Sequence, residues 1–178
     1  MYRICVRSNG RVSNDGERTG LLHDALSLGV GGLEDVQTAS LYFVEGDLTA
    51  RHVDELCEKL FVDPVTETAS WQALAEPYDA GPGRDDVWVV EVGLHPGVTD
   101  PVANQIVAMA AMLGMPAVQA ATGKRYELTG ALDEAAVHTI ARRLLCNPTI
   151  QNYYLGPMPP AFPQPAHASH HARSVSLL

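Results

Sequence analysis

Two adjacent cations beside an aromatic ring are the strongest candidates for binding chemistry in this sequence. Lys124 and Arg125 stand between Gly123 and Tyr126, in the segment Thr122-Gly123-Lys124-Arg125-Tyr126-Glu127. Gly123 permits close approach of a backbone, and two cations next to an aromatic ring can hold a phosphate or a carboxylate, or anchor an acidic partner surface. The alternative is a hairpin whose two cations are only solvated. The sequence leaves both interpretations open.

Side chains that could form a catalytic centre do not fall into a recognisable pattern. None of the seven histidines sits in a nucleophile elbow or near the other members of a triad. Cys57 and Cys146 fall on expected helices beside leucines, which is the setting of inert thiols. The histidines of segment 167–171 lie in low-complexity sequence without the hydrogen-bond partners that orient metal ligands. We therefore expect no catalytic residue and no metal site.

Composition and charge exclude several classes of protein. The chain has 178 residues, 46% of them hydrophobic and 19% charged, which is typical of a globular protein. Its net charge of −9 and lack of a basic cluster argue against a nucleic-acid partner. Three scattered cysteines fit a reducing compartment, and no apolar run suits a signal peptide or a membrane span. We expect a cytoplasmic protein.

An internal repeat with a shift of 84 residues organises the chain. Segment 36–68 resembles segment 118–152, and each closes on an acidic or amide residue followed by proline. A period this long indicates two copies of one module rather than a solenoid array. The matched apolar positions include Tyr42 with Tyr126, Val53 with Val137, Leu56 with Ile140, Leu60 with Leu144 and Phe61 with Leu145.

Local signals predict the elements that must position these residues. Thr49 is expected to cap a helix over 50–62, and Thr99 or Asp100 a helix that begins at Pro101. Ser13, Asn14 or Asp15 is expected to cap an earlier helix, which Gly29 is expected to end and whose inward stripe includes Leu28. Segment 87–92 is the strongest strand pattern and should lie inside a sheet. Each module then has the order β-α-β-β-α, with a possible extra strand at 151–155.

The predicted fold class is α+β, with antiparallel sheets and helices packed on one face. Residues 1–70 form the first, degenerate module, and residues 71–86 form a linker rich in Gly and Pro. Residues 87–156 form the second module, and residues 157–178 form a disordered Pro- and His-rich tail or linker.

Three segments of the second half together resemble a known family. They are His95-Pro96-Gly97-Val98-Thr99-Asp100-Pro101, then Gly123-Lys124-Arg125-Tyr126, then Leu144-Leu145-Cys146-Asn147-Pro148-Thr149-Ile150-Gln151-Asn152-Tyr153. In this order they resemble PurS, the small subunit of phosphoribosylformylglycinamidine synthase. The first half is similar to the same pattern but lacks its proline-glycine-valine turn and its glycine-lysine pair. His95 stands where the family usually carries lysine.

The resemblance implies an accessory role in de novo purine biosynthesis. PurS has no catalytic residues of its own and helps the synthetase and glutaminase subunits assemble, so that ammonia from glutamine reaches formylglycinamide ribonucleotide. The complex uses ATP and Mg, and this chain is expected to bind no cofactor itself. PurS acts as a dimer, so a tandem copy would be a pseudo-dimer resembling the N-terminal domain of large, fused synthases. The positions expected to contact a partner or a phosphate are His95, Gly97, Asp100, Gly123, Lys124, Arg125, Tyr126 and Asn147.

Two other functions remain as alternatives. Duplication together with Lys124 and Arg125 also fits a tandem α+β regulatory module that senses a small molecule between its halves. A free-standing enzyme acting through His95 and His138 is the third hypothesis. The sequence does not decide whether the two modules pair with each other or with a second chain, so self-association also stays open.

Overall fold

The fold is α+β, as expected, with one antiparallel sheet and helices on a single face. A computed structural model of the chain describes residues 1–9, 15–74 and 87–163. Within these ranges the sheet has six strands in the order β3-β1-β2-β5-β4-β6. The elements are β1 (Tyr2–Ser8), α1 (Asp15–Ser27), β2 (Leu33–Gly46), α2 (Ala50–Leu56) continued by the π-helical turn Cys57–Phe61, β3 (Glu67–Ala73), β4 (Val87–Leu94), α3 (Pro101–Met112), β5 (Val118–Gly130), α4 (Glu134–Ile140) continued by the π-helical turn Ala141–Leu145, and β6 (Gln151–Leu155).

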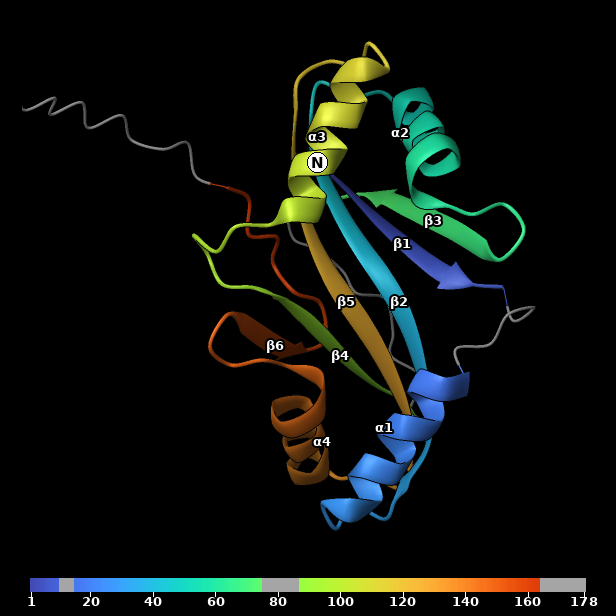
Figure 1. Cartoon of the computed structure of the whole chain (residues 1–178), viewed down its shortest axis with the longest axis vertical. Coiled ribbons are helices and arrows are strands. Elements are labelled where there is room, and N and C mark those ends of the chain that lie inside the picture. The colour runs from blue at the N-terminus through green and yellow to red at the C-terminus, as the bar shows by residue number, and fades with distance from the viewer. Residues whose placement is uncertain (10–14, 75–86, 164–178) are drawn as a thin grey trace, which may run out of the picture.

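The strand order reads as two equal halves that meet at β2 and β5. Residues 1–74 supply β3, β1 and β2, and residues 87–163 supply β5, β4 and β6 in the mirrored order (Figure 1). The two central strands pair along nearly their whole length, from Leu33 with Gly130 to Gly46 with Val118. One continuous hydrogen-bonded ladder therefore joins the halves.

The helices form a single layer in which each half exchanges a helix with the other. Figure 1 shows α3 beside α2 at one end of the layer and α1 beside α4 at the other. Ile106 of α3 packs with Leu56 of α2 in one buried cluster, and Ala25 of α1 packs with Ile140 of α4 in a second. Each cluster thus contains residues from both halves.

The repeat found in the sequence has a direct structural counterpart. Helix α2 begins at Ala50 and α4 begins at Glu134, 84 residues later, and their π-helical turns begin at Cys57 and Ala141, the same distance apart. The paired positions carry the core: Val53 with Val137, Leu56 with Ile140 and Phe61 with Leu145 are all buried.

Helix and turn signals in the sequence account for most element boundaries. The Thr49 side chain accepts from the backbone N–H of His52 and so caps α2, and the Asp100 side chain accepts from the N–H of Ala103 and caps α3 ahead of Pro101. Gly29 has a φ of +83°, which suits a residue that ends a helix. Leu28, expected to face inward, is 41% exposed.

Several expected boundaries need correction. The segment Thr122–Glu127 is no turn, because β5 runs through it without a break. Trp71 to Ala73, expected in the linker, are the last residues of β3. Met158, expected in a disordered tail, is 4% exposed and packs against Leu41 and Phe43 on the sheet face that carries no helices. The rest of the linker, from residue 75, and of the tail, from residue 164, lie outside the described residues, as do Ser13 and Asn14, which were expected to cap the first helix.

Candidate functional site

Lys124 and Arg125 lie on opposite faces of the sheet. Side chains of neighbouring residues in a strand point to opposite sides. The Lys124 Nζ lies 3.3 Å from the Glu17 Oε1 and 6.0 Å from the centre of the Tyr126 ring, on the face that bears the helices. Arg125 instead pairs with Glu91 and Glu127 on the other face. The two cations therefore cannot hold one phosphate together, because the expected hairpin is a continuous strand.

The space next to Gly123 is occupied by the Met158 side chain of the same polypeptide. A Cβ at this position would lie 2.6 Å from the Met158 Sδ and 2.9 Å from the Val92 carbonyl oxygen, and a Cβ at Gly93 would overlap the Met158 side chain as well. Such separations are shorter than side chains tolerate. The two glycines thus form the seat on which Met158 rests. The expected close approach at Gly123 is real, but its partner is Met158.

Asp100 fastens the start of α3 to the middle of the sheet. Its carboxylate accepts from the backbone N–H of Ala103 at 2.9 Å, from the backbone N–H of Thr122 at 3.0 Å and from the Thr122 hydroxyl at 2.8 Å. Asp100 is only 8% exposed. These three hydrogen bonds give Asp100 a structural role, which is to cap α3 and to tie its start to β5.

His95, Gly97 and Asn147 build two neighbouring loops at the end of β4. The His95 backbone N–H donates to the Ile150 carbonyl at 2.9 Å, and its ring Nε2 lies 3.1 Å from the Pro148 carbonyl oxygen. Gly97 has a φ of +88°, and the Asn147 side-chain oxygen accepts from the Thr149 N–H. The structure therefore places these three residues in adjoining loops beyond the end of β4.

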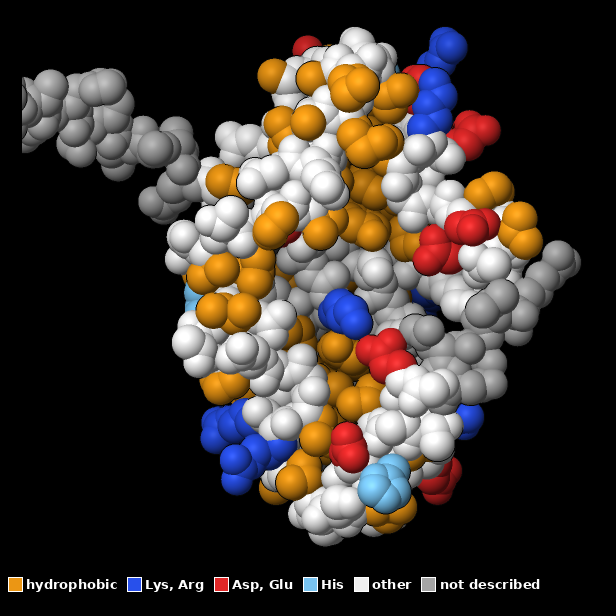
Figure 2. Space-filling view, viewed as in Figure 1, with side chains coloured by type: hydrophobic (Ala, Val, Ile, Leu, Met, Phe, Trp, Pro, Cys, Tyr) orange, Lys and Arg blue, Asp and Glu red, His pale blue; other side chains and the backbone are white. Residues whose placement is uncertain are grey.

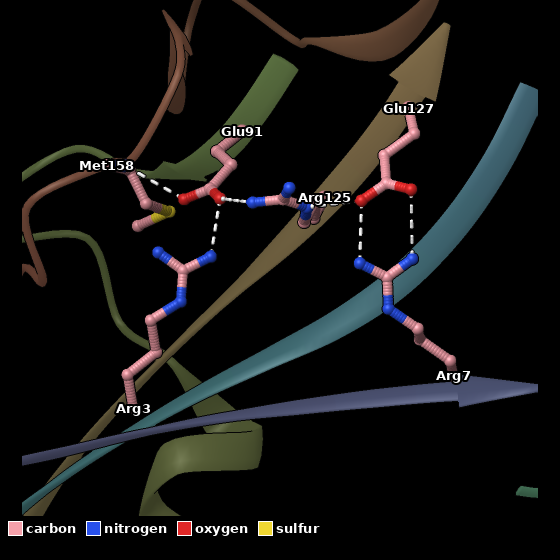
Figure 3. Close-up of polar contacts among 6 residues, drawn as sticks. All are labelled: Arg3, Arg7, Glu91, Arg125, Glu127 and Met158. Atoms are coloured by element: carbon pink, nitrogen blue, oxygen red, sulfur yellow. Dashed lines mark hydrogen bonds and ion pairs between the residues drawn. The ribbon is translucent and has the colours of Figure 1, made fainter. Parts of the chain in front are cut away.

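The most developed polar site is a chain of five ion-paired side chains on the helix-free face of the sheet. We call it the arginine–glutamate chain, and Figure 3 shows its members reaching toward one another from β1, β4 and β5. They are, in order of contact, Arg3, Glu91, Arg125, Glu127 and Arg7. Since β1 belongs to the first half and β4 and β5 to the second, these ion pairs bridge the halves.

The geometry of the arginine–glutamate chain is specific. Arg7 donates to both carboxylate oxygens of Glu127, at 3.0 and 2.6 Å, in a two-pronged contact. Arg125 donates through Nε to Glu127 at 2.8 Å and through Nη1 to Glu91 at 2.9 Å. Glu91 also accepts from Arg3 and, at 2.9 Å, from the Met158 backbone N–H. Glu91 is thus the hub, and it also fixes the Met158 segment.

Burial makes these charges depend on one another. Glu91 is 0% exposed and Arg3 is 5% exposed, so each needs the other's charge to offset lost hydration. The hydrogen bond from Arg7 is the largest influence on Glu127 and, with that from Arg125, lowers its pKa to about 2. Burial pulls the pKa of Arg125 down, but its hydrogen bonds to Glu127 and Glu91 more than compensate and raise it. Arg7, Arg125 and Glu127, whose pKa values all move away from neutrality, therefore stay ionised at neutral pH.

A polar hollow lies beside the arginine–glutamate chain. It has a volume of about 290 Å³, and the described residues that line it are Arg3, Cys5, Arg7, Ser70, Trp71, Gln72 and Arg125. The sequence offered a signal for this site that composition alone does not carry: charged residues alternate with apolar ones in Arg3-Ile4-Cys5-Val6-Arg7 and in Arg125-Tyr126-Glu127. Alternation places the charges on one face of a sheet.

The described residues offer little for covalent or metal chemistry. No three His, Cys, Asp or Glu side chains within 1–9, 15–74 and 87–163 gather as ligands for a metal ion. Burial raises the pKa of the Cys57 thiol to about 11 and also raises that of Cys146. In the same parts of the chain, no helix is long and apolar enough to cross a membrane. What the polar side chains form is an ion-paired scaffold with a cationic hollow.

Fold and site together define an α+β protein with two interlocked halves and a polar, ion-paired sheet face. Residues 87–156 match the PurS family model, described as phosphoribosylformylglycinamidine (FGAM) synthase. The match begins at the first residue of β4 and ends one residue after β6. The second half of the chain is therefore similar to the PurS family. No curated protein matches the chain.

Proposed function

We propose that the chain is a non-catalytic assembly component of FGAM synthase, either a separate subunit or the N-terminal part of a fused form. In this role it supports formation of the complex between synthetase and glutaminase and the transfer of ammonia between them. The observation that carries the proposal is the PurS match, whose limits coincide with β4 through β6. ATP and Mg belong to the partners in this scheme.

The first half supports a further step, in which the chain is a tandem pair that serves as a pseudo-dimer. Its strands and helices follow the order of the PurS-like half, and the sheet order is mirrored about β2 and β5. The exchange of α1 and α3 between the two buried clusters resembles the way two subunits interlock. A chain of this kind would present both halves of a dimer surface from one polypeptide.

The surface of α3 is suited to a partner. Helix α3 carries no charged residue, and Val102, Met109 and Met112 are 48%, 46% and 86% exposed. Figure 2 shows hydrophobic side chains gathered over this end of the helical layer. Exposed apolar patches on soluble proteins commonly mark interaction sites. We propose that this surface contacts the synthetase component, since contact with a partner would remove the exposed side chains of Met109 and Met112 from water.

The proposal is tested by reconstitution with the synthetase and glutaminase components of the same source. We expect glutamine-dependent product formation to require this chain, and ammonium-dependent formation to persist in its absence because free ammonia bypasses transfer between subunits. A mixture without the chain that uses glutamine at the full rate would refute the proposal.

A matched pair of variants tests the surface of α3. Met112→Glu introduces a charge on the apolar face of α3, while Leu26→Glu introduces the same charge at α1, where Leu26 is 61% exposed. We expect Met112→Glu to weaken co-elution with the synthetase at least tenfold and Leu26→Glu to leave it unchanged. Equal behaviour of the two variants would remove α3 as the contact surface without affecting the reconstitution result.

A further inference from the structure

The hollow on the helix-free face of the sheet has the composition of an anion site. Three of the described residues that line it are arginines, and none is aspartate or glutamate. Ser70 and Gln72 add a hydroxyl and an amide, both able to donate hydrogen bonds. A cavity with convergent cations and neutral donors favours a negatively charged group with several oxygens.

Arg7 and Arg125 have N–H groups that these ion pairs do not use. Each guanidinium carries five N–H groups. Arg7 uses one N–H of Nη1 and one of Nη2 on Glu127, and Arg125 uses Nε and one N–H of Nη1 on Glu127 and Glu91. Both side chains also line the hollow, and they retain 36% and 17% of their exposure. The unused N–H groups can therefore serve a ligand without breaking the ion pairs.

The ion pairs also prepare the site for binding. Glu91 and Glu127 hold Arg3, Arg7 and Arg125 in fixed positions, so a ligand need not immobilise long flexible side chains. Three cations and two carboxylates leave the arginine–glutamate chain with an excess of one positive charge. In a protein whose net charge is −9, this local excess is unusual.

We propose that this hollow binds a small oxyanion, a phosphate- or carboxylate-bearing molecule, through Arg7 and Arg125, with Ser70 and Gln72 as further donors. Its volume of about 290 Å³ is near the lower end for ligand pockets, which suits a compact molecule rather than a nucleotide. The site lies on the face opposite α3, so binding there is separate from the proposed assembly role. The ligand need not be a substrate of the synthase.

Isothermal titration of the full chain, dialysed free of phosphate, tests the proposal with inorganic phosphate and with succinate as separate probes. The two probes distinguish a phosphate site from a carboxylate site. We expect saturable binding of at least one probe that weakens as ionic strength rises. A thermal melt of each sample in the presence of the probe gives a second readout.

Three variants separate a built site from diffuse charge. Arg7→Gln should weaken binding roughly three- to tenfold, the effect of one charge several ångströms away in a partly solvated site. Glu127→Gln should tighten it by a similar factor, because it removes a repulsive carboxylate while the glutamine oxygen can still accept from the arginines and keep them in place. Arg18→Gln is the matched control, because Arg18 is a surface arginine paired with Asp35 and does not line the hollow. Circular dichroism spectra check that each variant is folded.

Opposite responses to Arg7→Gln and Glu127→Gln are the signature of the site. Absence of binding by both probes, in the native chain and in Glu127→Gln, would overturn the proposal. It would also be overturned if Arg18→Gln weakened binding as much as Arg7→Gln, or if Glu127→Gln weakened it too. If Arg7→Gln fails to fold, the direction of the Glu127→Gln effect still decides.

Discussion

Replacing Glu91 by glutamine should destabilise the protein more than any other single loss of charge in the arginine–glutamate chain. Glu91 is 0% exposed and accepts from Arg3, Arg125 and the backbone N–H of Met158. Glutamine has nearly the same size, so the variant removes the charge without leaving a cavity. It also introduces an amide group that must lie against guanidinium donors.

The expected magnitude follows from burial of the partner. Arg3 is 5% exposed and would lose its compensating charge, whereas Arg125 would keep Glu127. Removing one member of a buried ion pair typically costs about 3–5 kcal/mol. With a urea dependence of the unfolding free energy of about 2 kcal/mol per M, this corresponds to a midpoint lower by roughly 1.5–2.5 M. Arg3→Met should cost less, because Glu91 would retain Arg125 and the Met158 N–H.

Urea denaturation followed by tryptophan fluorescence and circular dichroism provides the measurement. The control is Glu55→Gln, which removes an exposed carboxylate paired with Lys59 on the same helical segment and should leave the midpoint unchanged. A midpoint for Glu91→Gln within error of that for Glu55→Gln would refute the view that the arginine–glutamate chain holds the halves together. Larger loss in Arg3→Met than in Glu91→Gln would refute the role of Glu91 as hub.

Three further outcomes are expected. The pKa of Glu127 is about 2 in the folded chain, below its ordinary value near 4.5, so its stabilising effect is complete above pH 4.5 and is lost as the pH falls toward 2. Urea titrations between pH 4.5 and pH 2 should therefore show a smaller loss of unfolding free energy for Glu127→Gln than for the native chain. An unchanged pH profile in the variant would count against the Arg7 contact. Gly93→Ala should lower stability by about 1–3 kcal/mol because the new Cβ overlaps Met158. The double variant Gly93→Ala, Met158→Ala should lose less stability than the sum of the two single variants, and strict additivity would contradict the contact between Gly93 and Met158. Gly31→Ala is the control and should be neutral, because a Cβ at Gly31 has no atom within 4 Å. With a pKa of about 11, Cys57 should have roughly one thiolate per thousand thiols at pH 8. It should therefore react with a disulfide reagent only as fast as the chain unfolds. Rapid labelling of Cys57 in the native protein would contradict its burial.

Periodic signals predicted the helices and the core well. The shift of 84 residues identified Val53 with Val137 and Leu56 with Ile140 as equivalent, and all four are buried. Caps were also readable, because Thr49 and Asp100 act through contacts within three residues. Contacts between residues that are close in sequence can be predicted from a short segment of the chain.

Sequence predicted the site poorly because its contacts are distant along the chain. Arg7 and Glu127 are 120 residues apart, and Arg3 and Glu91 are 88 apart. Such pairs depend on the order of strands in the sheet, which the pattern of one strand does not determine. Lys124 and Arg125 were grouped because they are neighbours in sequence, whereas the extended backbone of β5 separates them.

Glycine at position 123 illustrates a second limit. A strand interior with glycine can indicate a turn, a bulge or close approach of another group. The sequence favoured a turn or a ligand. The actual neighbour is Met158, which follows the last strand and could be placed only once the path of the chain across the sheet was known.

The pairing of β2 with β5 carries a consequence for how the two halves can diverge. Ser40 lies directly opposite Lys124, and Ala39 opposite Arg125. In a symmetric assembly of two identical chains, the position shared by Ser40 and Lys124 would face its own copy, and lysine there would meet lysine. Like charges opposite each other in a sheet repel. In the proposed tandem pair both halves belong to one polypeptide, so each side can change alone, and a cation can persist on one strand while its counterpart is small and neutral.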